Sequence, residues 1–231
     1  MNKLIYIWNK ICRKWMKIRL QPIRVFCLHH VCEQFDADAM YACDWMALDA
    51  FKKKINELRN QGYQFISLTE AYEHLKKDRF RYKKYAVLTI DDGYKSLNEV
   101  LPWLEAQQIP VTLFINGKYL DGKSYRETPK EQYLTYDELY SLTNPLIEIG
   151  HHGWEHTAAT EMTEEELLES LQKNIEVLST HPRYIPFWAY TWGRGTQNTD
   201  LILHKNLIVP ILITGGKNYS FKGNINREIL T

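Results

Sequence analysis

The sequence predicts an α/β fold, a distorted (β/α)7 barrel with parallel strands that is either closed or incomplete. Short apolar runs alternate with amphipathic helical stretches along most of the chain, the pattern of strand–helix–strand units in a parallel sheet. Seven such runs occur in 231 residues, a length that suits one large domain. An open doubly wound sheet is the alternative fold with the same pattern.

The predicted strands are short apolar runs bounded by polar or turn-forming residues. They cover residues 23–28, 65–68, 85–90, 111–115, 146–149, 185–189 and 211–214.

Helices are expected between most of these strands. Apolar residues at steps of three and four predict a helix over residues 48–58 that stops before Gly62. Thr69 is expected to cap a second helix that runs to Leu75. Thr163 opens a capping box, and the helix that follows it has four apolar positions expected to face inward: Leu167, Leu171, Ile175 and Leu178.

The composition is that of an ordinary soluble protein, with 45% hydrophobic and 25% charged residues. A net charge of +1 gives no reason to expect a nucleic-acid partner. The aromatic content of 13% is compatible with a sugar-binding cleft or with an aromatic core. The four cysteines include no C-x-x-C pair, so a zinc ribbon is not expected; they are interpreted as reduced, with a Cys32–Cys43 disulfide as the alternative.

Residues 1–21 form a basic amphipathic segment ahead of a barrel domain over residues 22–231. This segment has no acidic residue, and its Trp and Ile side chains recur at helical spacing among Lys and Arg. The pattern suits peripheral contact of residues 1–20 with an anionic membrane surface, or a solvated helix packed on the domain. Neither a cleavable signal peptide nor a transmembrane span is evident, so the protein is expected in the cytoplasm or at the membrane surface. The oligomeric state stays open.

Polar residues follow the ends of the predicted strands, where barrel enzymes build their active sites. They are His29, Asp91, Asp92, Asn116, His152 and Tyr190.

Two pairs of residues indicate a metal site. Asp91 and Asp92 end an apolar run, and adjacent carboxylates repel each other unless a cation is nearby, although Asp-Gly is also a common turn. His152 and His156 are four residues apart and would face one side of a helical turn, with His151 as a less suitable alternative ligand. One carboxylate and two imidazoles leave a metal open to water, and the second carboxylate can act as a base. This set predicts metal-assisted hydrolysis.

The chain resembles the polysaccharide deacetylase family, also called NodB-homology or carbohydrate esterase family 4. Thr89-Ile90-Asp91-Asp92-Gly93 is similar to the family motif T-F-D-D-G, and residues 152–156 are similar to H-[ST]-x-x-H with Gly153 in place of the hydroxyl residue. The resemblance covers roughly residues 23–231. It implies that Asp91 is the general base and that Asp92, His152 and His156 hold one divalent ion, usually zinc and sometimes another transition metal.

Two further family features are less complete. Residues 185–193 resemble the segment that lines the acetyl pocket, which implies substrate contacts by Trp188, Tyr190 and Trp192, to which Asn116 is added from its strand end. Residues 28–31 resemble the Tyr-His-x-Val motif of the subgroup that acts on poly-N-acetylglucosamine. This implies His29 as the general acid, with His30 as the alternative.

The predicted function is therefore removal of N-acetyl groups from an N-acetylated amino-sugar polymer or glycan, with release of acetate. One alternative is a non-catalytic carbohydrate-binding protein on the same scaffold. Another is a deacylase that acts on a lipid-linked sugar or an O-acetyl ester.

Overall fold

The computed structural model describes residues 21–38, 40, 45–77, 83–124, 126 and 132–230. The strands are β1 (Ile23–Leu28), β2 (His30–Cys32), β3 (Trp45–Ala47), β4 (Tyr63–Phe65), β5 (Lys84–Ile90), β6 (Val111–Ile115), β7 (Ile147–His151), β8 (Tyr184–Ala189), β9 (Val209–Ile213) and β10 (Ile225–Ile229). The α-helices are α2 (Leu48–Asn60), α3 (Leu68–Lys77), α4 (Leu97–Ala106), α5 (Tyr136–Ser141), α6 (Glu164–Leu178) and α7 (Gln197–Lys205). The 3₁₀ turns are η2 (Gly117–Asp121), η3 (Ala159–Glu161) and η4 (Thr191–Gly193).

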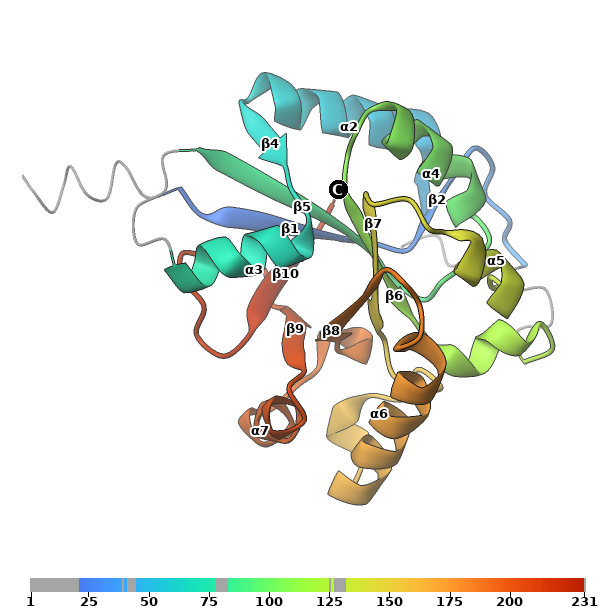
Figure 1. The fold of residues 1–231 in the computed structure, drawn as a ribbon. Coiled ribbons are helices and arrows are strands. Elements are labelled where there is room, and N and C mark those ends of the chain that lie inside the picture. The colour runs from blue at the N-terminus through green and yellow to red at the C-terminus, as the bar shows by residue number, and fades with distance from the viewer. Residues whose placement is uncertain are drawn as a thin grey trace, which may run out of the picture.

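Seven parallel strands close into a barrel, in the order β1, β10, β9, β8, β7, β6, β5 and back to β1. The closing pair, β1 with β5, is in register from Ile23 opposite Tyr85 to Leu28 opposite Ile90. In Figure 1, α2 and α4 lie on one side of the strands, and α6 and α7 lie on the other. The predicted barrel is confirmed, and it is closed rather than incomplete or open.

Alternation along the strands separates the barrel interior from the helix-covered outside. Phe26 and Leu88 belong to a cluster that includes Phe51 of α2. Their neighbours Val25 and Val87 belong to a second cluster, which fills the barrel. Within each strand, every second side chain therefore faces the barrel interior, and the residues between them face the helices.

Helix α3 covers one end of this interior. Leu68 and Leu75 pack in the interior cluster, and the buried carboxylate of Glu148 accepts the backbone N–H of Leu68 at 3.0 Å. A carboxylate at a helix N-terminus is favourable because it meets unpaired N–H groups and the positive end of the helix dipole. The barrel is therefore filled and capped at one end, and the carboxyl ends of the strands remain for a site.

Two predicted elements have different boundaries in the structure, and one strand was not predicted. The run over residues 65–68 contributes only the short strand β4, which pairs with β5 outside the barrel circuit. Helix α3 starts after Ser67, whose hydroxyl accepts the N–H of Glu70 at 3.1 Å, so Thr69 is not its cap. The seventh barrel strand is β10, which sequence reasoning missed because Arg227 interrupts its apolar pattern.

Other predicted elements hold. Helix α2 spans the predicted apolar repeat, and Thr163 forms the expected capping box at the start of α6. Cys27 and Cys32 are buried free thiols. Cys12, Cys43 and the segment over residues 1–20 lie outside the described residues.

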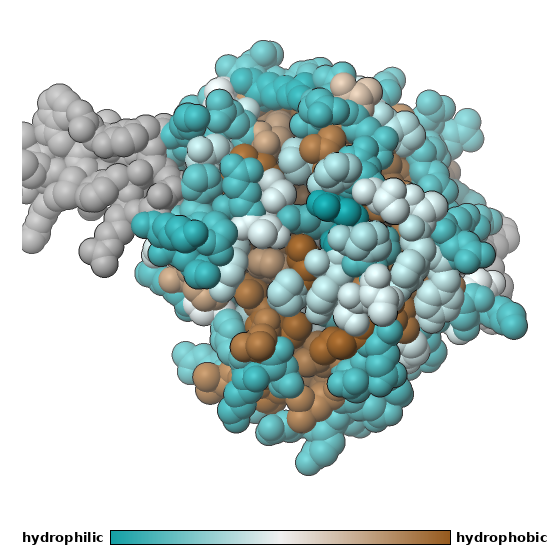
Figure 2. All heavy atoms as spheres, viewed as in Figure 1, coloured by the Kyte–Doolittle hydropathy of each residue, from teal (hydrophilic) through white to brown (hydrophobic). Residues whose placement is uncertain are grey.

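The face of the molecule drawn in Figure 2 is mostly hydrophilic. Figure 2 shows hydrophobic residues gathered on the lower part of the face that Figure 1 presents, in the region of α6 and α7. Leu201 of α7 and Leu207 just after it are 59% and 84% exposed. Within the described part of the chain, no helix combines the length and the apolar character that crossing a bilayer requires.

Candidate metal centre and active site

The candidate site is the last interior layer of the barrel, at the carboxyl ends of its strands. His29, Asp91, Asn116 and His152 each lie one residue beyond β1, β5, β6 and β7, respectively, at positions whose side chains face the barrel interior. Together with Asp92, His156 and the ends of β9 and β10, three of these side chains line a cavity of about 230 Å³. Its lining residues are His29, Asp91, Asp92, Arg126, His152, His156, Trp192, Ile213 and Ile229.

Asp92, His152 and His156 form a compact group whose ligand atoms all lie within 4.8 Å of one another. Asp92 Oδ1 is 3.4 Å from His152 Nε2 and 3.2 Å from His156 Nε2. All three residues are buried. The predicted ligands are therefore brought together in space.

The donor set fits a divalent cation. His152 Nδ1 lies 2.9 Å from the carbonyl oxygen of Ala189, and a proton on that nitrogen leaves the Nε2 lone pair directed at Asp92. Burial lowers the pKa of His152 and brings that of His156 to about 3, so both imidazoles are neutral at pH 7. Among the described residues, Asp92 Oδ1 is a buried atom without a hydrogen-bond partner. Lone pairs that face one another without a proton between them match a cation site.

A loop, rather than the predicted helical turn, holds the two histidines. His152 and His156 follow β7 in a run of bends, and the φ angles of Gly153 and His156 are 81° and 61°. Positive φ values interrupt a right-handed helix. Glycine adopts the left-handed backbone found at residue 153 without strain. The Asn116 amide fixes this loop by donating to the carbonyl oxygens of His152 and Gly153 at 2.6 and 3.1 Å.

Asp91 is held by an arginine that sequence reasoning missed. Arg227 Nη1 and Nη2 donate to Asp91 Oδ1 and Oδ2 at 2.6 and 2.8 Å, and both side chains are fully buried. Burial alone would raise the pKa of Asp91, but the charge and hydrogen bonds of Arg227 and the neighbouring His152 together outweigh burial, and the pKa is lowered. Arg227 lies between Ile225 and Ile229 on one face of a strand, and that alternation was the available signal for a buried arginine.

The structure separates His29 from His30. His29 lines the cavity with Asp91, as its place on the interior face requires. His30 faces the other way, where it stacks on Tyr94 at 3.8 Å between ring centroids and lies 3.1 Å from the Ser96 hydroxyl.

Arg126 reaches the ligand group from the long loop after η2. Its Nη1 lies 3.2 Å from Asp92 Oδ2 and 3.1 Å from His156 Nε2. The guanidinium thus shares a ligand atom that a bound metal would need. Arg126 was not among the site residues that the sequence predicted.

The predicted substrate residues divide into two groups. Trp192 lies at the cavity rim and is 57% exposed, with its ring 5.0 Å from that of His156. The other three side chains are buried and do not line the cavity, so their contact with substrate stays a prediction. Trp188 and Tyr190 face the helices and pack in the cluster against α6 and α7, and Asn116 holds the histidine loop.

His151 is not part of the ligand group. It is fully buried on the face of β7 that turns toward the helices, and its Nε2 lies 2.9 Å from the Tyr184 hydroxyl. Burial lowers its pKa to about 3. It is therefore a neutral histidine of the protein interior.

Comparison with known proteins agrees with the geometry. The poly-beta-1,6-N-acetyl-D-glucosamine N-deacetylase of Escherichia coli (strain K12) is 25% identical over 144 residues, which are 58% of this chain and 21% of that protein. The chain thus spans about a fifth of the length of this relative. IcaB from Ammonifex degensii has a similar fold, with a TM-score of 0.76 at 20% identity over 91% of this chain and 92% of that one. A de-N-acetylase from Aggregatibacter actinomycetemcomitans has a TM-score of 0.71 at 14% identity, over 90% and 95%.

The family model for polysaccharide deacetylases matches residues 78–207. This range is more than half of the chain and contains Asp91, Asp92 and both ligand histidines, while His29 and Arg227 lie outside it. The chain belongs to the polysaccharide deacetylase family.

Proposed function

We propose that this protein hydrolyses the N-acetyl amide of an amino-sugar polymer and releases acetate. The observation that carries the proposal is the convergence, in one cavity, of a metal-type ligand group with a separate carboxylate and a separate imidazole. Amide hydrolysis needs an activated water, a proton acceptor and a proton donor for the leaving nitrogen. The cavity offers residues for each of these tasks.

Asp92, His152 and His156 would hold one divalent ion, with zinc as the first candidate for an N,N,O set. When bound, such an ion acidifies water and polarises a carbonyl oxygen. Burial keeps both imidazoles neutral and able to bind a cation. The contact of His152 Nδ1 with the Ala189 carbonyl fixes the ring, so that its Nε2 stays aimed at the ion position.

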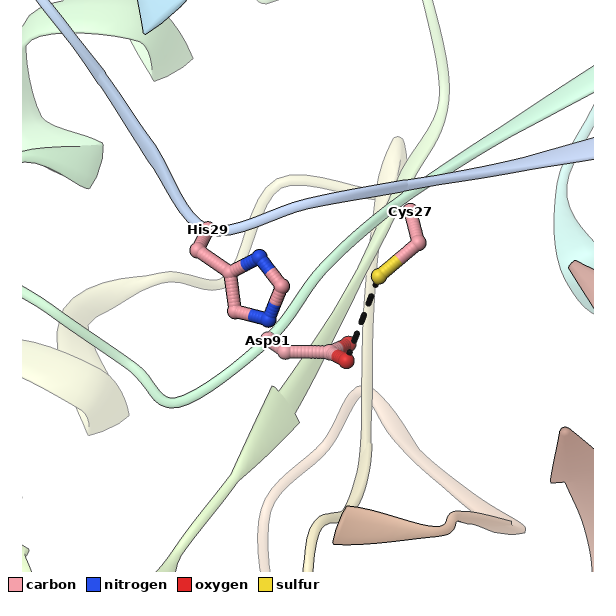
Figure 3. A group of neighbouring side chains, drawn as sticks. All are labelled: Cys27, His29 and Asp91. Carbon is pink, nitrogen blue, oxygen red and sulfur yellow. Dashed lines mark hydrogen bonds between the residues drawn. The ribbon is translucent and has the colours of Figure 1, made fainter. Parts of the chain in front are cut away.

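Asp91 is proposed as the proton acceptor. Arg227 keeps this carboxylate ionised and fixes its plane, so that a lone pair is available to a water in the cavity. His29 is proposed as the proton donor to the departing amine, because its ring lies beside Asp91 on the cavity wall. In Figure 3 the His29 ring points toward the Asp91 carboxylate.

The open rim is proposed as the sugar site. The exposed face of Trp192 can cover a sugar ring, and Ile213 and Ile229 supply an apolar wall beside the ligand group, where an acetyl methyl would fit. The name of the Escherichia coli relative supports poly-N-acetylglucosamine as the first polymer to test.

Acetate release from N-acetylglucosamine oligomers by zinc-loaded protein tests the function. We expect Asp91→Asn to lower turnover about 10²- to 10⁴-fold with one equivalent of metal still bound, since it removes the proton acceptor but none of Asp92, His152 and His156. Asp49→Asn is the control, because that carboxylate is 98% exposed and lies on α2. Unchanged turnover in Asp91→Asn would reject Asp91 as the base. Metal-loaded wild type that releases no acetate from acetamido sugars would reject the proposed function.

A further inference from the structure

A second group of metal-binding side chains lies next to the first, in the described part of the chain. It consists of Cys27, His29 and Asp91, whose ligand atoms also lie within 4.8 Å of one another. Cys27 Sγ lies 3.4 Å from Asp91 Oδ2. Figure 3 shows the thiol and the imidazole on either side of the Asp91 carboxylate.

Strand geometry explains why these side chains converge. Cys27 and His29 are two residues apart at the end of β1, so both side chains face the barrel interior. The register of β1 with β5 places Cys27 opposite Thr89, and Asp91 follows Thr89 on the same face. The backbone N–H of Asp91 donates to the carbonyl of Leu28 at 2.9 Å, which holds the carboxyl ends of β1 and β5 together. The cluster is therefore built by paired strands rather than by a loose surface loop.

The ligand types differ from those of the first group. Thiolate sulfur, imidazole nitrogen and carboxylate oxygen together suit zinc and softer ions such as cadmium, whereas Asp92, His152 and His156 offer no sulfur. Arg227 occupies one lone pair on each Asp91 oxygen, and an ionised carboxylate has about four acceptor positions. One thiolate and one carboxylate balance a divalent charge, with the Arg227 guanidinium on the far side of Asp91.

We propose that Cys27, His29 and Asp91 form a second, sulfur-containing site for a thiophilic divalent cation. On binding, a sulfur–metal bond replaces the Cys27 S–H bond, and the proton passes to solvent with no change in oxidation state. A bound cation would coordinate both the proton acceptor, Asp91, and the proton donor, His29, so occupation of the site stops hydrolysis. This inhibitory consequence rests on the proposed function, whereas the binding of the ion does not.

Cadmium titration of the full chain, first loaded with one equivalent of zinc, tests the binding. The readouts are bound cadmium and the ultraviolet sulfur-to-cadmium charge-transfer band. We expect Cys27→Ala to bind about one equivalent less than wild type and to lose the band. Cys32→Ala is the matched control, because Cys32 is also a buried free thiol but lies in β2 beside Gln34 and Met40. It should keep both the equivalent and the band.

His29→Ala is a second variant that removes a half-buried ligand and leaves the thiol in place. It should weaken cadmium binding at this site by at least about tenfold, as is usual when a ligand shell is disrupted. Cadmium binding and a charge-transfer band that stay at the wild-type level in both Cys27→Ala and His29→Ala would overturn the second site.

Inhibition is measured separately, relative to the uninhibited rate of each variant. The cadmium concentration that halves acetate release should be at least about tenfold higher in Cys27→Ala than in wild type or Cys32→Ala. Equal values would overturn the inhibitory role even if the ion binds. If zinc-loaded wild type releases no acetate, the proposed function fails, while the cadmium stoichiometry and band still decide the second site.

Discussion

At the scale of single residues, charge and protonation decide what the cavity can hold. Asp92 is buried beside two imidazoles and a guanidinium, and although burial opposes ionisation, these neighbours together lower its pKa. Arg126 places a positive charge at the position where a metal would lie. The guanidinium and a divalent ion therefore compete for the same carboxylate.

Arg126→Ala is expected to bind zinc at least about tenfold more tightly than wild type. Coulomb repulsion between two unit charges about 4 Å apart is worth about 1–4 kcal/mol between the dielectric constants of water and of a protein surface. A competition titration with a chromophoric chelator measures the affinity. Arg194→Ala removes the same charge from an arginine that pairs with Glu161, and it should leave the affinity unchanged. Zinc affinity of Arg126→Ala at or below the wild-type value would contradict the competition.

His151 predicts an acid-sensitive fold in the metal-free protein. Its pKa is lowered from 6.5 to about 3, so between these values the unfolded chain binds a proton that the folded chain does not. Stability is then lost as the pH falls from 6.5 toward 3, by about 1.4 kcal/mol per pH unit for one such group. His30 and His156, with pKa values lowered to about 4 and about 3, act in the same direction.

Denaturant unfolding between pH 6.5 and 4.5, with chelator present, measures this dependence. His151→Gln should reduce the slope of unfolding free energy against pH by about one proton, whatever its effect on absolute stability. An unchanged slope would show that His151 takes up a proton in the folded state.

At the scale of elements, close packing between neighbouring strands fixes the position of β7, which leads into the loop that carries His152. Gly150 of β7 lies inside the barrel, where a Cβ atom would meet the Phe114 ring at 2.7 Å and the Phe187 carbonyl oxygen at 3.0 Å. Phe114 and Phe187 belong to the interior cluster, so neither can move freely. The glycine is required for space, two residues before a proposed metal ligand.

Gly150→Ala is expected to destabilise the fold by about 1–3 kcal/mol, the usual cost of overpacking a core. It should also weaken zinc binding, because relief of the clash displaces the strand that leads to His152. Denaturant unfolding and metal titration measure the two effects. Wild-type stability in this variant would contradict the close packing at this position.

At the scale of the whole molecule, the barrel and the site share one charge pair across the interior. Arg227 on β10 reaches Asp91 after β5 and also donates to the Thr89 hydroxyl at 2.9 Å. Arg227 and Asp91 are 136 residues apart in sequence and meet only because the barrel closes through β1. The Arg227–Asp91 contact therefore depends on the closed barrel.

Arg227→Met is expected to destabilise the protein by about 3–5 kcal/mol, because it leaves the Asp91 charge buried without its partner. Adding Asp91→Asn to that variant should restore part of the loss, since the unpaired charge is then gone. Unfolding of the two single variants and the double variant completes a double-mutant cycle. Strictly additive effects would mean that the two residues do not interact.

The alternation of apolar runs and helical repeats was sufficient to predict the parallel barrel, because burying those faces leaves few arrangements. Motif spacing was sufficient to predict Asp91, Asp92, His152 and His156 as site residues, because each pair lies within one short motif. Long-range contacts were not predictable. Strand alternation and pairing turned Trp188 and Tyr190 toward the helices, and barrel closure brought Arg227 and Cys27 to Asp91. The sequence thus determined which residues could do chemistry, and only the tertiary structure decided which of them face the same cavity, because side-chain direction and neighbours depend on strand register and closure.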